Sequence, residues 1–144
     1  MKFWDSSALV PLCVEEPATA PVVALLEADA AVAVWWSTPV ECASALARLE
    51  REEKLDAADA AHAFARLDGF AKAWMFIEPL AEIREVARRL LRVHVLRAAD
   101  ALQLAAAFVA AERRPPTLTV VTLDDRVAAV ARKEGFRVIE PGAE

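Results

Sequence analysis

Short apolar runs alternate along the chain with longer stretches of helical periodicity. Residues 31–36 read AVAVWW and are continuously apolar, as expected for a strand buried on both faces of a sheet. Residues 118–122 (LTVVT) form a second run, rich in the β-branched residues that strands favour. Together with residues 2–5, 73–77 and 136–139, these runs predict five strands.

Helical stretches separate the predicted strands. We expect Thr38 to cap the third helix with Pro39 in its first position, and Gly135 to end the last helix. Pro11 lies near the middle of the first helix or marks a break in it. Strands that alternate with helices predict an α/β fold with a mainly parallel sheet. The predicted helices span residues 6–14, 18–28, 37–54, 56–70, 80–93, 98–111 and 124–134.

Length and composition favour one globular domain. The chain has 144 residues, 57% of them hydrophobic, and no repeat or linker divides it, so we expect a single domain over residues 1–144 with residues 141–144 as a tail. No run approaches the roughly 20 apolar residues of a membrane span, and Asp5 and Pro11 break the first apolar run, so we expect a cytoplasmic protein. Cys13 and Cys42 are isolated, which indicates buried reduced thiols.

The absence of several sequence motifs argues against some classes of enzyme. Its three glycines stand outside the strand-to-helix turns, which argues against a dinucleotide-binding Rossmann enzyme and a P-loop NTPase. There is no GxSxG elbow, and neither His62 nor His94 has a triad setting. His94 lies beside an arginine cluster and could contact phosphate, but a structural role is favoured. The net charge of −5 opposes a surface that is basic throughout and leaves room for a local basic patch.

Four acidic residues follow predicted strands or begin predicted helices, and each has a structural explanation. Asp5 and Asp124 suit N-caps. Glu41 has the capping-box spacing from Thr38. Asp100 suits the positive end of a helix dipole.

Two of the acids have neighbours that bear on these explanations. Asp100 can pair with Arg97, and its apolar neighbours predict a semi-buried carboxylate that needs a partner. Asp125, beside Asp124, is expected to be a solvated first-turn acid.

Taken together, the four acids predict a metal site. In an open parallel sheet the carboxyl ends of the strands converge on one crevice at the topological switch point. Carboxylates gathered there repel one another and raise one another's pKa. Hard divalent cations such as Mg²⁺ or Mn²⁺ relieve that repulsion, and they can activate water and stabilise the charge on a phosphodiester under attack.

Four segments carry a resemblance to a known family, and together they span essentially the whole chain. They are DSSAL at Asp5, TPVE with Glu41, RAADALQLAAA with Asp100 and TLDDRVAAVARKEGFRVI with Asp124. The chain resembles PIN-domain ribonucleases, and among them the VapC-like toxins of bacterial and archaeal toxin–antitoxin pairs.

The resemblance implies a three-layer α/β/α sandwich with a five-stranded parallel sheet. It implies that Asp5, Asp100 and Asp124 hold Mg²⁺ or Mn²⁺, with Glu41 as a further ligand, directly or through water. Ser7 and Thr122 match positions where the family often has a small hydroxyl residue near the metal. The implied activity is endonucleolytic RNA cleavage by metal-activated water, and the implied partners are a small antitoxin whose tail enters the site and a second copy of the chain.

An arginine-rich segment precedes Asp100 and predicts where RNA is held. Arg92 and Arg97 lie nearest the proposed site, and we expect them to bind phosphate. For Arg84 the alternative, ion pairing with acids on its own helix, is favoured. Of Trp35 and Trp36, which could stack on bases, at least one is expected in the core.

Two other functions compete with a nuclease. One is a non-catalytic PIN-like module that binds a partner protein; the presence of all four acids opposes it. The other is a different acidic-pocket α/β protein, such as a phosphatase or receiver domain. The DSS after the first strand, in place of DxD, opposes this second alternative.

Overall fold

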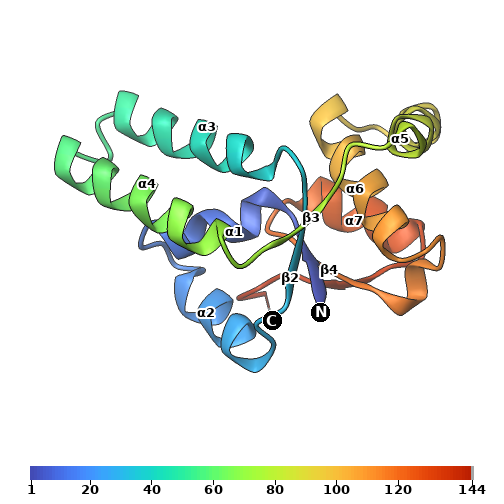
Figure 1. The fold of residues 1–144 in the computed structure, drawn as a ribbon, viewed down its shortest axis with the longest axis horizontal. Helices are drawn as coiled ribbons and strands as arrows, with labels where there is room; N and C mark the ends of the chain where they lie inside the picture. Colours follow the sequence, from blue (N-terminus) through green and yellow to red (C-terminus); the bar gives the residue numbers. More distant parts are fainter. Residues whose placement is uncertain (144) are drawn as a thin grey trace.

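The computed structural model describes residues 1–143, which form a parallel five-stranded sheet with helices on both faces (Figure 1). Phe3 in the central strand is opposite Ala33 on one side and Val120 on the other. The strand order is β3-β2-β1-β4-β5. The strands are β1 (Lys2–Trp4), β2 (Val32–Trp35), β3 (Met75–Ile77), β4 (Thr119–Val121) and β5 (Arg137–Ile139).

Every predicted helix is present, with small shifts at the ends. Within residues 1–143, none is long and apolar enough to cross a membrane. The helices are α1 (Ser6–Cys13), α2 (Thr19–Ala28), α3 (Thr38–Arg51), α4 (Ala57–Ala71), α5 (Ala81–Val93), α6 (Ala98–Ala110) and α7 (Asp125–Lys133), with a short 3₁₀ turn at Pro115–Thr117.

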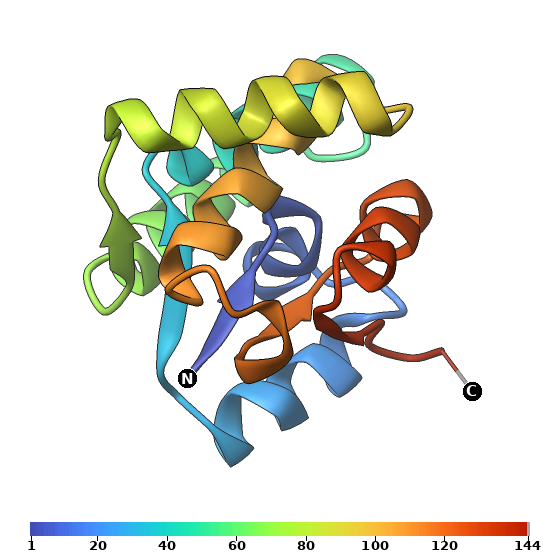
Figure 2. The ribbon, with the colours of Figure 1, turned by 90° about the vertical axis from the view of Figure 1, so that its right-hand side faces the viewer.

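The three layers follow from the alternation of side chains along the strands. Phe3 faces the side covered by α5, α6 and α7, whereas its neighbour Trp4 faces the side covered by α1 to α4. Both residues are fully buried, so apolar strands with no polar alternation are what this sandwich requires. Figures 1 and 2 show the two groups of helices on opposite sides of the sheet, with α5 lying across the top of Figure 2. The predicted α/β/α architecture is confirmed.

The strand order places the topological switch point at β1. The chain moves from β1 to β2 and β3 on one side, then returns to β4 and β5 on the other. At the carboxyl end of β1, the backbone N–H of Asp5 donates to the carbonyl of Val121 at 3.0 Å, which ties the ends of β1 and β4 together. In such sheets this edge is where ligands bind.

The start and end of α3 differ from the sequence prediction. Ser37 occupies the N-cap position without a side-chain cap bond, and Pro39 is therefore the second helical residue. Thr38 is fully buried, and its hydroxyl receives a hydrogen bond from Gln103. The tertiary contact thus replaces the expected cap. At the other end the helix stops before Lys54, because Glu53 adopts a left-handed backbone with φ of 58°.

Other local predictions are confirmed with one exception. Pro11 lies within α1, and Gly135 follows the last helix with φ of 97°. Cys13 and Cys42 are buried free thiols. The expected tail is wrong at its first residue, because Pro141 is buried; Glu144 lies outside the described residues.

Candidate active site

One pocket at the carboxyl edge of the sheet brings together the four acids that the sequence singled out. The pocket has a volume of about 340 Å³. Asp5 enters it from the end of β1 and Glu41 from the first turn of α3. Asp100 comes from the first turn of α6, and Asp124 from the N-cap of α7. Residues up to 119 positions apart in the sequence, Asp5 and Asp124, thus line one cavity.

Asp5 is buried and is held by two hydroxyl groups rather than serving as a helix cap. Its Oδ2 accepts hydrogen bonds from Ser7 Oγ at 2.6 Å and Thr122 Oγ1 at 2.9 Å. Although it occupies the N-cap position of α1, its side chain makes no cap bond, so the cap interpretation is wrong for this residue. Burial raises the pKa of Asp5; the two hydroxyl groups lower it, and the charges of Asp100 and Asp124 raise it further, with a net upward shift.

Ser7 and Thr122 also fix the loop that carries Asp124. The backbone N–H of Leu123 donates to Ser7 Oγ at 2.9 Å, and that of Asp124 donates to Thr122 Oγ1 at 3.0 Å. The same hydroxyls therefore position both Asp5 and the loop after β4.

Glu41 does not form the expected capping box. Its carboxylate instead accepts a short hydrogen bond from the side-chain amide of Gln103, which also donates to Thr38. Burial raises the pKa of Glu41 to about 7; the bond from Gln103 lowers it, while Asp5 and Asp100 raise it. In the metal-free pocket, a pKa of about 7 allows the Glu41 carboxyl to exchange a proton near neutral pH.

Gln103 is a site residue that the sequence analysis did not assign. It is 1% exposed, and its carbonyl oxygen has no hydrogen-bond partner among the described residues. The available signal was its position: it is the single glutamine of the chain, set in a helix that is otherwise almost wholly apolar. A buried amide requires a polar partner, and here that partner is Glu41.

Asp100 and Asp124 share a cation, Arg97. Arg97 Nε donates to Asp100 Oδ2 at 3.1 Å, and its Nη2 lies 3.7 Å from Asp124 Oδ2. The Arg97 side chain is 70% exposed, so it reaches the carboxylates from the solvent side. The expected pairing of Asp100 with Arg97 is present.

Asp124 combines the two roles that the sequence left open. Its Oδ1 caps α7 by accepting from the backbone N–H groups of Arg126 and Val127 at 2.9 and 3.0 Å. Its Oδ2 remains for Arg97 and the pocket. Asp125 lines a neighbouring pocket rather than this one.

The carboxylates suit a hard divalent cation in chemistry but are not arranged around one. Within residues 1–143, no three Asp, Glu, His or Cys side chains are grouped as metal ligands. Arg97 supplies the positive charge beside Asp100 and Asp124. The four carboxylates offer oxygen donors only, which Mg²⁺ and Mn²⁺ prefer. A cation bound at Asp100 Oδ2 would have to displace Arg97 Nε from that oxygen.

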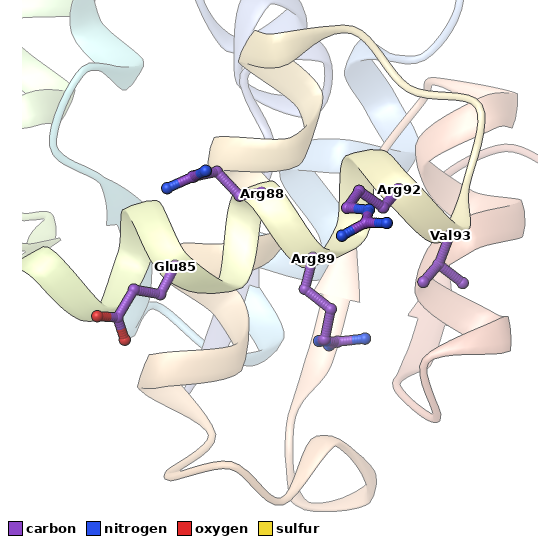
Figure 3. A pocket seen from close by; sticks show the side chains of 5 residues that line it. All are labelled: Glu85, Arg88, Arg89, Arg92 and Val93. Carbon is purple, nitrogen blue, oxygen red and sulfur yellow. The ribbon is translucent and has the colours of Figure 1, made fainter.

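Two of the arginines lie in places that the sequence did not predict. Arg97 lines the acidic pocket, as expected, and so does Arg48 of α3, which the sequence analysis missed. Arg48 could have been found from its spacing, because a separation of seven residues places it on the same helical face as Glu41. Arg92 instead lines a separate groove on α5 with Arg88 and Arg89; Figure 3 shows their side chains extending in different directions from the helix.

The remaining candidates have structural roles. His94 Nε2 lies 2.6 Å from Glu134 Oε1, which confirms the structural role favoured for this residue. Glu82 pairs with Arg113, and among residues 1–143 Arg84 forms no ion pair, so the pairing favoured for Arg84 is wrong. Trp35 is buried, as expected for one of the two tryptophans.

Comparison with known proteins explains this arrangement. A family model described as "PIN domain" matches residues 2–133. The chain belongs to the PIN-domain family. Two PIN-family relatives of the chain are Ribonuclease VapC45 and Ribonuclease VapC49, from the CDC 1551 / Oshkosh and the ATCC 25618 / H37Rv strain of Mycobacterium tuberculosis, respectively. Each is 33% identical over 137 residues, covering 94% of this chain and 92% of the relative. The resemblance to VapC-like PIN proteins is confirmed.

Solved structures share the PIN fold of this chain. FitAcB from Neisseria gonorrhoeae superposes with a TM-score of 0.66 at 20% identity, covering 98% of both chains. PAE2754 from Pyrobaculum aerophilum gives a TM-score of 0.62 at 24% identity, covering 95% of this chain and 87% of that one. The α/β/α sandwich seen here is thus shared by proteins of low sequence identity.

Proposed function

We propose that this protein is a metal-dependent endoribonuclease and the toxin of a toxin–antitoxin pair. The observation that carries the proposal is the single pocket lined by Asp5, Glu41, Asp100 and Asp124 at the switch point of the sheet. The ribonuclease relatives, which match over nearly the whole chain, support the same reaction.

Each side chain has a part in the proposed reaction. Asp5, Asp100 and Asp124 would hold Mg²⁺ or Mn²⁺, which lowers the pKa of bound water and stabilises charge on the phosphodiester. Glu41 would complete the site as a further ligand, directly or through water. Ser7 and Thr122 keep Asp5 in place.

We further propose two protein partners: a small antitoxin whose tail enters the pocket, and a second copy of the chain. An exposed apolar groove supports the dimer. Trp36 and Leu80, each 55% exposed, line it together with Ile83 and Leu102. Apolar side chains gathered at a groove are typical of interaction surfaces. The cytoplasm is the compartment in which such a protein meets RNA.

The experiment is cleavage of labelled single-stranded RNA by the purified protein in Mg²⁺ or Mn²⁺, with EDTA as the metal-free control. We expect internal cleavage that EDTA abolishes. Asp5→Ala and Asp100→Asn should reduce the rate by roughly 100-fold or more, because each removes a metal ligand. Glu27→Gln on α2, an exposed acid outside the acidic pocket and the α5 groove, is the matched control and should cleave normally. Unchanged cleavage in either aspartate variant would reject the assigned site.

The alternative is a PIN module that binds a partner without catalysis. The observation in its favour is the ion pairing of Arg97 with Asp100 and Asp124, which neutralises the pocket without a metal. Calorimetry distinguishes the two functions: heat of Mn²⁺ binding that is lost in Asp100→Asn supports the nuclease, and absence of binding supports the module.

A further inference from the structure

We propose that the RNA strand crosses the acidic pocket along a track of three arginines, Arg48, Arg97 and Arg126. In this arrangement Arg48 and Arg126 bind phosphates on opposite sides of the one that is cleaved. The inference rests on the proposed ribonuclease function and adds to it the path of the substrate.

The track follows two adjoining pockets. The acidic pocket contains Arg48, Arg97 and Asp124. A second pocket, of about 400 Å³, is lined by Arg97, Asp124, Asp125 and Arg126. Arg97 and Asp124 line both pockets, so the two pockets adjoin, with Arg48 bordering only the first and Arg126 only the second.

Arg48 is placed at one end of the track by the geometry of α3. Glu41, Ser44, Ala45 and Arg48 all line the acidic pocket, at helical spacings that define one face. Seven residues carry Arg48 about 10 Å along the helix from Glu41. The small side chains of Ser44 and Ala45 between them leave room for a strand. Among the described residues Arg48 has no ion-pair partner, so its guanidinium is available to phosphate.

Arg126 occupies the other end, in the first turn of α7. Its backbone N–H is used to cap the helix through Asp124 Oδ1. Its side chain lines the second pocket and, over residues 1–143, forms no ion pair. The helix N-terminus beside it adds partial positive charge.

Electrostatics explain why such a track is needed. The protein carries a net charge of −5 and gathers four carboxylates where the phosphodiester must approach. Arginine binds phosphate through a planar fork of donors, so guanidinium groups on both sides offset this repulsion. The arginine groove of α5 shares no lining residue with the acidic pocket. RNA binding by Arg92 in that groove, as expected from the sequence, is therefore the alternative to RNA binding along the track.

Fluorescence anisotropy tests the track with a labelled single-stranded RNA and the Asp5→Asn protein, which keeps substrate uncleaved. Arg48→Ala and Arg126→Ala should each weaken RNA binding by roughly three- to tenfold. Each should also reduce the slope of log affinity against log salt by about 0.7, the loss of one phosphate contact. Arg51→Ala on α3 and Lys133→Ala on α7 are matched controls that remove one charge from the same helices outside the pockets.

The possible results distinguish failure of the arginine track from failure of the proposed ribonuclease function. If the native protein cleaves RNA but Arg48→Ala and Arg126→Ala bind like their controls, the track is wrong and the nuclease stands. A larger loss of affinity from Arg88→Ala combined with Arg92→Ala would also overturn the track and assign RNA to the α5 groove. If the native protein fails to cleave RNA with either metal, the proposed function itself fails.

Discussion

Glu41 and Asp5 are carboxyl groups that burial makes harder to ionise. Burial raises the pKa of both, and each accepts hydrogen bonds that offset only part of this shift. A protein without metal therefore retains protons in its pocket at a pH where an exposed carboxyl has lost them. The same groups that suit a divalent cation thus destabilise the fold when they are ionised without one.

The stability of the metal-free protein should consequently depend on Glu41. Its pKa of about 7 lies above the ordinary 4.5, so its favourable contribution is complete below pH 4.5 and is lost as pH rises through 7. Replacement by Gln removes that dependence. Between pH 4.5 and 8 in EDTA, we expect the native protein to lose about 1–2 kcal/mol relative to Glu41→Gln, a value reduced for the partial exposure of the side chain. Urea unfolding measures it, with Glu85→Gln as control; parallel pH profiles for native protein and Glu41→Gln would contradict the prediction.

Arg97 is a second residue with a specific expected effect. Its guanidinium contacts Asp100 and lies near Asp124, where a metal would need the same oxygens. Arg97→Ala should therefore bind Mn²⁺ several-fold more tightly in calorimetry, while its affinity for RNA falls. Arg51→Ala should change neither quantity. Equal or weaker Mn²⁺ binding in Arg97→Ala would show that the guanidinium does not compete with the metal.

Among the elements, α5 and α7 are joined by one carboxylate. Glu134, at the end of α7, accepts from Arg89 at 3.2 and 3.0 Å and lies 2.6 Å from His94, where α5 ends. Burial opposes ionisation of Glu134, but the bonds from Arg89 and His94 lower its pKa below the ordinary value. This contact holds the end of the arginine-rich helix against the layer that carries Asp124.

Glu134→Gln should destabilise the fold at neutral pH by about 1 kcal/mol, the scale of a partly exposed ion pair. Because the pKa of Glu134 is lowered, its contribution is present above pH 4.5 and disappears as pH falls through the folded-state pKa. The difference between native and variant in thermal unfolding should therefore shrink in acid. Glu85→Gln, an exposed acid on α5 that forms no ion pair among residues 1–143, is the control. A difference that stays constant down to pH 3 would show that charge is not the source.

At the scale of the whole molecule, the architecture was predictable because its signals are local. The continuous run at residues 31–36 implies burial on both faces, and alternation with helices implies parallel strands. The convergence of Asp5 and Asp124 followed from the rule for strand ends and from the family resemblance. The predicted helices and strands therefore agree with the observed ones to within a few residues at their ends.

The unpredicted features depend on contacts between distant segments. Gln103 meets Glu41 across 62 positions, which no local pattern specifies. Because Glu41 accepts this tertiary hydrogen bond, it is a partly buried acid of the pocket and does not form the predicted capping box. Arg92 was predicted from its proximity in sequence to Asp100, but the two residues line different pockets. Proximity in sequence placed Arg92 on the helix before Asp100, but it could not specify which groove the Arg92 side chain lines.

The proposed dimer is also a property of the whole molecule. If Trp36 and Leu80 pack against a second copy, the native protein should elute as a dimer in light-scattering chromatography at micromolar concentration, and Leu80→Arg should elute as a folded monomer. Val95→Arg, at another exposed apolar residue, is the control and should remain dimeric. A native protein that is monomeric throughout would contradict the proposed interface.

The central claim is that the carboxylates of this pocket hold a catalytic divalent ion, and anomalous diffraction from crystals grown with Mn²⁺ tests it most directly. We predict one or two anomalous peaks in the pocket, with oxygens of Asp5 and Asp100 about 2.1 Å from the ion and Arg97 turned away from both acids. A saturated crystal with no peak there, and with Arg97 still bonded to Asp100, would contradict the account.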